Sequence, residues 1–145
     1  MITYTIAEVE DLENITRLLR INDLPFSDIK ESAIEFIVAK NDNELIGCIG
    51  LEVHGTEGLL RSFAVDNNFR KMGIGKEMYH RLLSYATQNN IRTLHLLTNT
   101  AKDYFTKTGF IAANRSKAPE LINKSAEFAG LCPASSVYMV LEDVQ

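Results

Sequence analysis

The chain has 145 residues, which is the size of one domain and enough to bury a core without disulfides or metals. Hydrophobic residues make up 46% and charged residues 23%, as in globular proteins, and the net charge of −4 argues against a basic nucleic-acid-binding domain. Two cysteines exclude a disulfide scaffold, and no apolar run reaches the ~18 residues of a membrane span. We therefore expect one cytoplasmic domain over residues 1–145, without a metal, a nucleic-acid partner or a membrane partner.

The hydrophobic pattern predicts strands and helices along the whole chain. Alternation predicts a strand at 1–6, and apolar residues spaced by three and four predict an amphipathic helix over 8–21. Pro25 ends helical geometry, and Ser27 is a typical cap for a short second helix. The other predicted elements are strands at 34–39, 44–54 and 59–65, a helix beginning at the glycines 73 and 75 and ending at 89–90, a strand at 93–98, a helix at 101–107, a strand at 110–113, a helix at 118–128 and a strand at 135–141. A meander followed by alternating helices and strands predicts an α+β (mixed α/β) fold.

A loop with the pattern Arg-x-x-Gly-x-Gly leads from the strand at 59–65 into the next helix. Gly73 and Gly75 let the backbone turn tightly and leave N–H groups pointing outward. The first N–H groups of a helix lack internal partners and carry partial positive charge, so the junction favours an anion such as a pyrophosphate. Arg70, Lys71 and Lys76 add positive charge. The pattern is neither a Rossmann fingerprint nor a Walker loop, and the alternative is a helix start with glycines for close packing.

Three stretches resemble the signature blocks of the GNAT superfamily of N-acetyltransferases, namely residues 59–65, 70–76 and 97–110. Further stretches are similar to the small acetyltransferases encoded in arsenic-resistance operons, namely residues 50–54, 60–62 and 131–139. Leu97-Thr98 together with Phe105 also resembles the acetyltransferase domain of N-acetylglutamate synthase. The resemblance implies a central, twisted, mixed sheet of about seven strands flanked by helices. It also implies that the strands ending at Val65 and Thr98 splay apart at an acetyl-CoA site.

The activity implied by this resemblance is transfer of an acetyl group from acetyl-CoA to an amine by direct attack. The backbone at 63–65 would pair with the pantetheine arm like an added strand, and the N–H of Val65 would polarise the acetyl carbonyl. The pyrophosphate would lie on the 70–76 loop, and Asn99 would add a pantetheine contact. The residues implied to bind the cofactor are Phe63, Ala64, Val65, Arg70, Lys71, Gly73, Ile74, Gly75, Lys76 and Asn99.

Two positions depart from the family pattern. Many members have a tyrosine that protonates the leaving thiolate where this chain has Phe105, and some have a catalytic glutamate where it has Leu59. Tyr104 is the neighbouring candidate acid, with a packing role as the alternative. Water is a further alternative, because a thiolate with a pKa near ~8.5 is a tolerable leaving group.

Glu52 and His54 are the candidate bases for the acceptor amine. They lie two apart on a predicted strand and therefore share a face. A histidine titrates in the right pH range, although a position at a strand end is also typical of a surface residue.

Arg61 is a charged residue in the middle of a predicted strand. Strict alternation would put it on one face with Leu59, Phe63 and Val65, where an unpaired charge is costly. Its guanidinium fork fits a carboxylate, so one interpretation is a clamp for the acid group of an amino-acid-like substrate. The alternative is an internal salt bridge, for example to Glu52.

The leading hypothesis is an N-acetyltransferase acting on a small acid-bearing amine, such as an amino acid or an amino-acid-like toxin. Phe26 and Thr98 are further candidates for the acceptor pocket, with a core role as the alternative for Phe26. Acetylation of proteins or peptides, and a CoA-binding sensor without catalysis, are the alternative functions. We also expect a homodimer.

Overall fold

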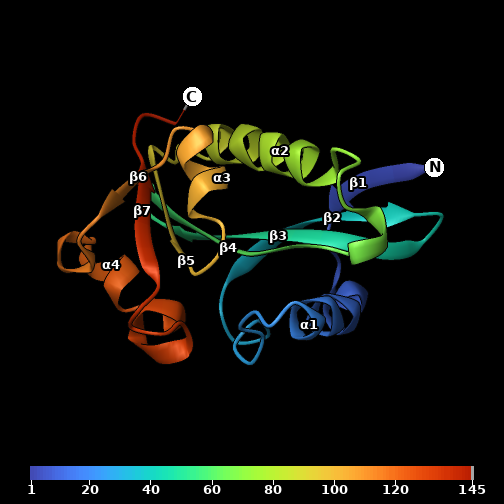
Figure 1. Cartoon of the computed structure of the whole chain (residues 1–145), viewed down its shortest axis with the longest axis horizontal. Coiled ribbons are helices and arrows are strands. Elements are labelled where there is room, and N and C mark those ends of the chain that lie inside the picture. The colour runs from blue at the N-terminus through green and yellow to red at the C-terminus, as the bar shows by residue number, and fades with distance from the viewer. Residues whose placement is uncertain (145) are drawn as a thin grey trace.

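Seven strands form one mixed sheet in the computed structural model, which describes residues 1–144 (Figure 1). In spatial order the strands are β1 (Ile2–Ile6), β2 (Ile34–Asn41), β3 (Glu44–His54), β4 (Glu57–Val65), β5 (Thr93–Thr98), β7 (Val137–Leu141) and β6 (Ile111–Ala113). β4 and β5 are parallel, and every other neighbouring pair is antiparallel. The predicted α+β fold with about seven strands is confirmed.

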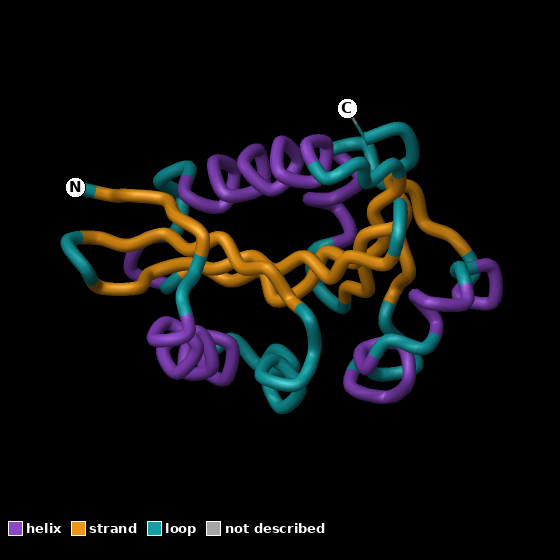
Figure 2. The backbone as a smooth tube through the Cα atoms, turned by 180° about the vertical axis from the view of Figure 1, so that it is seen from behind, coloured by secondary structure: helices purple, strands orange, loops and turns teal. Residues whose placement is uncertain are grey.

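Helices cover both faces of the sheet (Figure 2). α2 and α3 lie on one face, and α1 and α4 lie on the other (Figure 1). Their bounds are α1 (Leu12–Ile21), α2 (Ile74–Gln88), α3 (Lys102–Lys107) and α4 (Glu120–Asn123), with 3₁₀ turns at Val9–Asp11, Asn67–Phe69 and Arg115–Lys117 and a π-helical turn at Glu127–Leu131. None of the helices within residues 1–144 is long and apolar enough to cross a membrane.

Two predicted helices are wrong in detail. Residues 27–32 form turns instead of a helix, because the carboxylate of Asp28 is drawn into the sheet by Arg61 and accepts a hydrogen bond from Ser32. The predicted helix over 118–128 is divided into α4 and the π-helical turn. At the division the Ser125 hydroxyl donates to the carbonyl of Ile122, 2.6 Å away.

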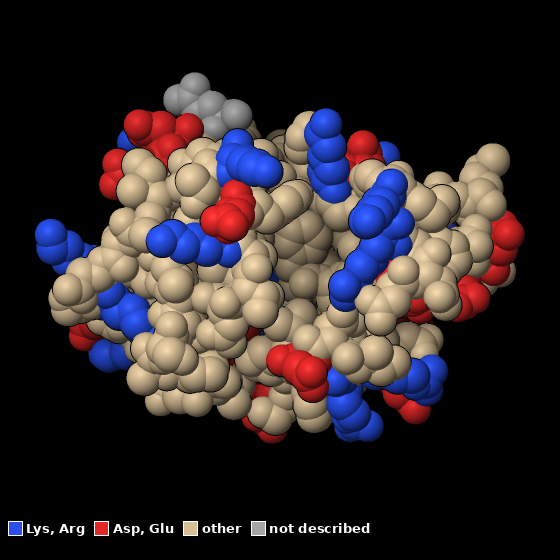
Figure 3. All heavy atoms as spheres, in the orientation of Figure 1, with Lys and Arg blue, Asp and Glu red and all other residues tan. Residues whose placement is uncertain are grey.

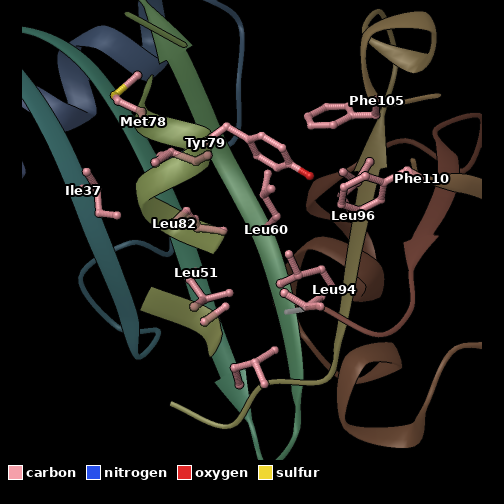
Figure 4. Close-up of a cluster of buried hydrophobic side chains, with 14 of the residues drawn as sticks. Ile37, Leu51, Leu60, Met78, Tyr79, Leu82, Leu94, Leu96, Phe105 and Phe110 are labelled. Atoms are coloured by element: carbon pink, nitrogen blue, oxygen red, sulfur yellow. The ribbon is translucent and has the colours of Figure 1, made fainter. Parts of the chain in front are cut away.

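The main core lies between α2 and the sheet. The predicted stripe of α2 at every fourth residue is buried, with Ile74, Met78, Leu82 and Ala86 all at most 2% exposed. Figure 4 shows the Tyr79 ring of α2 directed toward Phe105 and Phe110, and the ring centres of Tyr79 and Phe110 lie 6.5 Å apart. This packing fixes the start of α2 above β4.

A bulge in β4 reverses the face of its second half. Cys48 pairs with Ala64 but Gly50 pairs with Arg61, so one residue of β3 opposes two of β4, and Ser62 has a φ of +56°. The predicted single face is therefore wrong. The Phe63 side chain packs on the α2 side, as Val65 does, whereas Arg61 lies on the α1 and α4 side.

β4 and β5 pair over only part of their length. Their ladder runs from Glu57 with Thr93 to Leu59 with His95, and β5 then continues alongside β7 to Thr98. The second half of β4 is thus left without a strand partner on this side. The predicted separation of the two strands is present, and it leaves backbone groups of β4 available to a ligand.

Candidate active site

The loop before α2 presents unsatisfied N–H groups. Lys71 and Gly73 both adopt left-handed backbone conformations, with φ of +67° and +80°, and α2 begins at the next residue, Ile74. No side chain within residues 1–144 caps this end of α2. The free N–H groups and the helix dipole make the junction suited to an anion.

The basic residues of this loop have different roles. Arg70 donates from Nε to the Val65 carbonyl at 3.3 Å and from Nη2 to Asn22 Oδ1 at 2.6 Å. It therefore ties the loop to the end of β4 and to the end of α1. Lys71 and Lys76 are exposed and add positive charge to the loop.

Aromatic rings line the start of the gap between β4 and β5. The Phe63 ring lies 6.2 Å from both the Tyr104 and the Phe105 rings of α3, between α3 and the start of α2. Tyr104 is 39% exposed and Phe105 is buried. The space-filling view shows a hollow in this region, with Lys and Arg side chains on both sides (Figure 3).

The last residue of β5 and the residue after it form hydrogen bonds with neighbouring segments. The Thr98 hydroxyl accepts a hydrogen bond from the Ala101 N–H at 3.0 Å and so holds the start of α3. Asn99 Oδ1 accepts from the Ser136 hydroxyl at 2.8 Å and connects this loop to the segment before β7. The structure thus gives Thr98 a structural contact, whereas Asn99 is exposed beside the gap.

Arg61 is the centre of a buried ion cluster. Its Nη1 and Nη2 donate to the two carboxylate oxygens of Asp28 at 2.7 and 2.6 Å, and Nη1 also donates to Glu52 Oε2 at 2.9 Å. Its Nε donates to the Ser62 hydroxyl at 3.2 Å and lies 3.4 Å from Glu127 Oε2. The guanidinium is fully buried, and the three carboxylates are at most 10% exposed.

This geometry favours the internal salt bridge over the carboxylate clamp. The fork of Arg61 is filled by Asp28, so a substrate carboxylate would have to displace a bidentate ion pair. Sequence reasoning anticipated Glu52 as a partner but missed Asp28 and Glu127. A buried mid-strand arginine requires carboxylates, but partners that are distant in the sequence carry no local signal.

The charges of the cluster do not cancel, since three carboxylates surround one guanidinium. Burial raises the pKa of Asp28, but hydrogen bonds from Arg61 and Ser32 outweigh it, and the pKa lies below its usual range. Burial raises the pKa of Glu127 to about 7, helped by repulsion from Glu52 and Asp28 and opposed by Arg61. Glu127 is therefore the member of the cluster that exchanges a proton near neutral pH.

Glu127→Gln is expected to stabilise the protein at pH 8. The folded-state pKa of about 7 lies above the ordinary value of 4.5, so ionisation costs native stability as the pH rises from about 4.5 to about 7. The glutamine variant lacks this loss, which gives it roughly 3 kcal/mol more stability at pH 8. Thermal unfolding of both proteins from pH 4 to 9 tests this, since the difference should vanish near pH 4. An equal difference at every pH would contradict the assignment.

Glu52 and His54 are in contact, as their spacing predicts. His54 Nε2 lies 3.3 Å from Glu52 Oε1, while the other oxygen of Glu52 accepts from Arg61. Phe26 is half-buried under Arg20, whose guanidinium carbon lies 4.9 Å from its ring centre. Phe26 also lines a surface cavity of about 400 Å³ on the outer side of α1.

A second polar network joins the strands where β4 and β5 still pair. His95 contacts Glu57 Oε1 through Nε2 and the Tyr138 hydroxyl through Nδ1, both at 2.7 Å. The His95 and Tyr138 rings also stack, with centres 5.8 Å apart. Sequence reasoning missed this network, which fastens β4, β5 and β7 together below the gap.

Comparison with known proteins places this arrangement in a family. The model of the Acetyltransferase (GNAT) family matches residues 4–110. The chain belongs to the GNAT family. The expectation drawn from the 59–65, 70–76 and 97–110 stretches is thus confirmed at the level of the family, whereas the arsenic-resistance subtype is not shown.

Solved structures share the fold over nearly the whole chain. N-acetylglutamate synthase from Neisseria gonorrhoeae, complexed with coenzyme A and L-arginine, is 21% identical with a TM-score of 0.79, covering 99% of this chain and 34% of that one. This chain therefore spans about a third of that enzyme. A GNAT-family acetyltransferase from Staphylococcus aureus is 19% identical with a TM-score of 0.78, covering 98% and 99% of the two chains. The ribosomal-protein-S18-alanine N-acetyltransferase from Escherichia coli is 16% identical with a TM-score of 0.76, covering 100% and 96%.

Proposed function

We propose that this GNAT protein transfers an acetyl group from acetyl-CoA to the amino group of a small molecule by direct attack. One observation carries the proposal: the open half of β4 ends beside an uncapped helix start that presents free N–H groups. An extended pantetheine arm matches the first feature and a pyrophosphate matches the second. The coenzyme A bound to the gonococcal relative supports the same donor.

Each part of acetyl-CoA has proposed partners on this surface. The pantetheine arm follows the backbone of Phe63, Ala64 and Val65, with Asn99 on the opposite side of the gap. The acetyl carbonyl accepts from a backbone N–H of this stretch, with Val65 as the residue that the resemblance implies. The pyrophosphate lies on the α2 junction, where its proposed partners are Arg70, Lys71, Gly73, Ile74, Gly75 and Lys76.

The acceptor amine enters from the face that carries Arg61. The surplus of carboxylates there attracts an ammonium group and repels a carboxylate, so the acid group of an amino acid would be bound away from Arg61. Phe26 lies in the same segment between α1 and β2 as Asp28, and it is a proposed wall of the acceptor site. The resemblance to acetyltransferases of arsenic-resistance operons keeps amino-acid analogues among the acceptors to test.

Tyr104→Phe is expected to lower kcat about 100-fold with little change in the KM for acetyl-CoA. The Tyr104 hydroxyl is the proposed donor to the leaving thiolate, because Tyr104 contacts Phe63 at the gap while Phe105 has no proton to donate. Steady-state kinetics of the variant test this, with Tyr85→Phe on α2 as the control. A kcat equal to that of the wild type would indicate that water, and not Tyr104, protonates the leaving thiolate.

Thiol release from acetyl-CoA across a panel of amines tests the proposed function. The panel contains simple monoamines, diamines, amino acids, phosphinic amino-acid analogues and short peptides. Turnover on small amines supports the proposal, and turnover restricted to peptides supports protein acetylation. Binding of CoA without turnover on any amine would favour the sensor alternative.

A further inference from the structure

We infer that Glu127, supplied by the segment before β7, is the catalytic residue that accepts the proton of the acceptor amine. The inference rests on the proposed function. It differs from the expectation drawn from the sequence, in which Glu52 or His54 is the base. The structure gives the three buried carboxylates different surroundings, and these separate their roles.

Asp28 and Glu52 are held as fixed partners of Arg61. Both oxygens of Asp28 accept from Arg61, and one of them also accepts from Ser32. Glu52 has one oxygen on Arg61 and the other against His54. Protonation of Asp28 would break these contacts, and the pKa of Asp28 accordingly lies below its usual range.

Glu127 is less firmly bound than either. Its carboxylate lies 3.4 Å from Arg61 Nε, whose hydrogen is directed to the Ser62 hydroxyl, and it accepts a hydrogen bond from the uncharged Cys132 thiol. The residue is 3% exposed, so its carboxylate is removed from bulk water without a strong ion pair of its own. A buried carboxylate in such a position favours a proton.

The segment that carries Glu127 is rigidly held. Arg115 donates to the carbonyls of Phe128 at 3.1 Å and Pro133 at 3.0 Å, and its guanidinium lies over the Phe128 ring. The Cys132 N–H donates to the Glu127 carbonyl, which closes the π-helical turn. The turn therefore fixes the Glu127 carboxylate against Arg61.

The position of Glu127 also suits proton transfer from the acceptor amine. Arg61 directly precedes the bulge at Ser62, and Phe63 begins the stretch proposed to pair with pantetheine. A group in contact with Arg61 thus lies on the acceptor side of the strand that carries the thioester. In the proposed reaction the amine approaches from this side, where the Glu127 carboxylate lies beside Arg61 with those of Asp28 and Glu52.

The charged and titratable neighbours of Glu127 come from four parts of the chain. They are Arg61 on β4, Glu52 with His54 on β3, Asp28 before β2, and Cys132 with Arg115 around the turn. Burial raises the pKa of the Cys132 thiol to about 12, so this neighbour stays neutral near pH 7. The pKa of Glu127, raised to about 7, allows the carboxylate to form within the working range of an enzyme.

The proposed reaction replaces the C–S bond of the thioester with an N–C bond and moves protons at both ends. The acceptor ammonium gives one N–H proton to the Glu127 carboxylate, and its nitrogen lone pair then attacks the thioester carbon. The new N–C bond forms and the C–S bond breaks, the departing thiolate takes a proton from the Tyr104 hydroxyl, and the acylated nitrogen loses its second proton, which restores Tyr104. The products are an N-acetyl amine and CoA thiol. Glu127 returns its proton to solvent before the next turnover.

Steady-state kinetics of Glu127→Gln against pH test the inference. We expect kcat to fall about 100-fold or more at pH 7.5, while the KM for acetyl-CoA changes little. The rise of kcat/KM with pH through about 7 should disappear in the glutamine variant. Glu127→Asp should recover part of the rate and restore the rise, because it keeps a carboxylate.

Glu120→Gln is the matched control, since Glu120 is an exposed glutamate of α4 paired only at the surface with Lys124. It should keep the wild-type rate and pH profile. The acetyl-CoA-induced rise in Tm verifies that each variant is folded. Wild-type rate and profile in folded Glu127→Gln would overturn this inference alone, whereas a wild-type protein without turnover on any amine would overturn the proposed function.

Discussion

Arg61→Met is expected to lower the free energy of unfolding by about 3–5 kcal/mol. The change leaves the buried carboxylates of Asp28, Glu52 and Glu127 without their shared cation, and a buried charge left uncompensated is strongly destabilising. For a chain of this length the loss corresponds to a fall in Tm of roughly 10–15 °C. Thermal unfolding at pH 8 measures it.

Arg17→Met is the control for this variant. Arg17 is an exposed residue of α1 with one hydrogen bond to Asn14, so its replacement should change stability by less than about 0.5 kcal/mol. The destabilisation of Arg61→Met should decrease as the pH falls, because the carboxylates become neutral. A loss of under about 1 kcal/mol at pH 8 would show that the cluster does not need its cation.

Gly73→Val is expected to weaken CoA binding at least tenfold while leaving most of the protein folded. Gly73 has a φ of +80° at the start of α2, where a branched side chain costs about 1–2 kcal/mol of backbone strain. Relief of that strain would turn away the N–H groups that face the pyrophosphate. Loss of even one or two such hydrogen bonds, at about 1.5–3 kcal/mol each, weakens binding at least tenfold.

Gly75→Ala is the control for Gly73→Val, because it adds a side chain to the same junction without backbone strain. Its backbone is ordinary helix, and an added Cβ would meet the Phe63 ring at 3.5 Å, an ordinary contact. This variant should keep both its stability and the rise in Tm that CoA produces in the wild type. Calorimetric titration with CoA gives the affinities. Wild-type affinity in Gly73→Val would show that the α2 junction is not the pyrophosphate site.

The fold could be predicted well from the sequence because its signals are local. Alternation located the strands, and a stripe at every fourth residue located α2, whose bounds follow from the glycines and from Asn89. The bulge at Ser62 gave no such signal. One inserted residue reverses the face of everything after it, and no local pattern marks where it occurs.

The candidate site could be predicted in part. The α2 junction lies in one continuous segment, so its chemistry was visible in the pattern of glycines and basic residues. The cluster around Arg61 draws Asp28, Glu52 and Glu127 from three distant segments, and only Glu52 was suggested by proximity in the sheet. The carboxylate clamp was therefore predicted from the charge of Arg61 without the partners that fill its fork.

The most direct test of the account is the mass of the product formed from acetyl-CoA and a small amine by the wild-type protein. We expect thiol release to require both the protein and the amine, and the amine to gain one acetyl group on nitrogen. Tight CoA binding without any acetylated amine, or acetyl transfer to water alone, would contradict it.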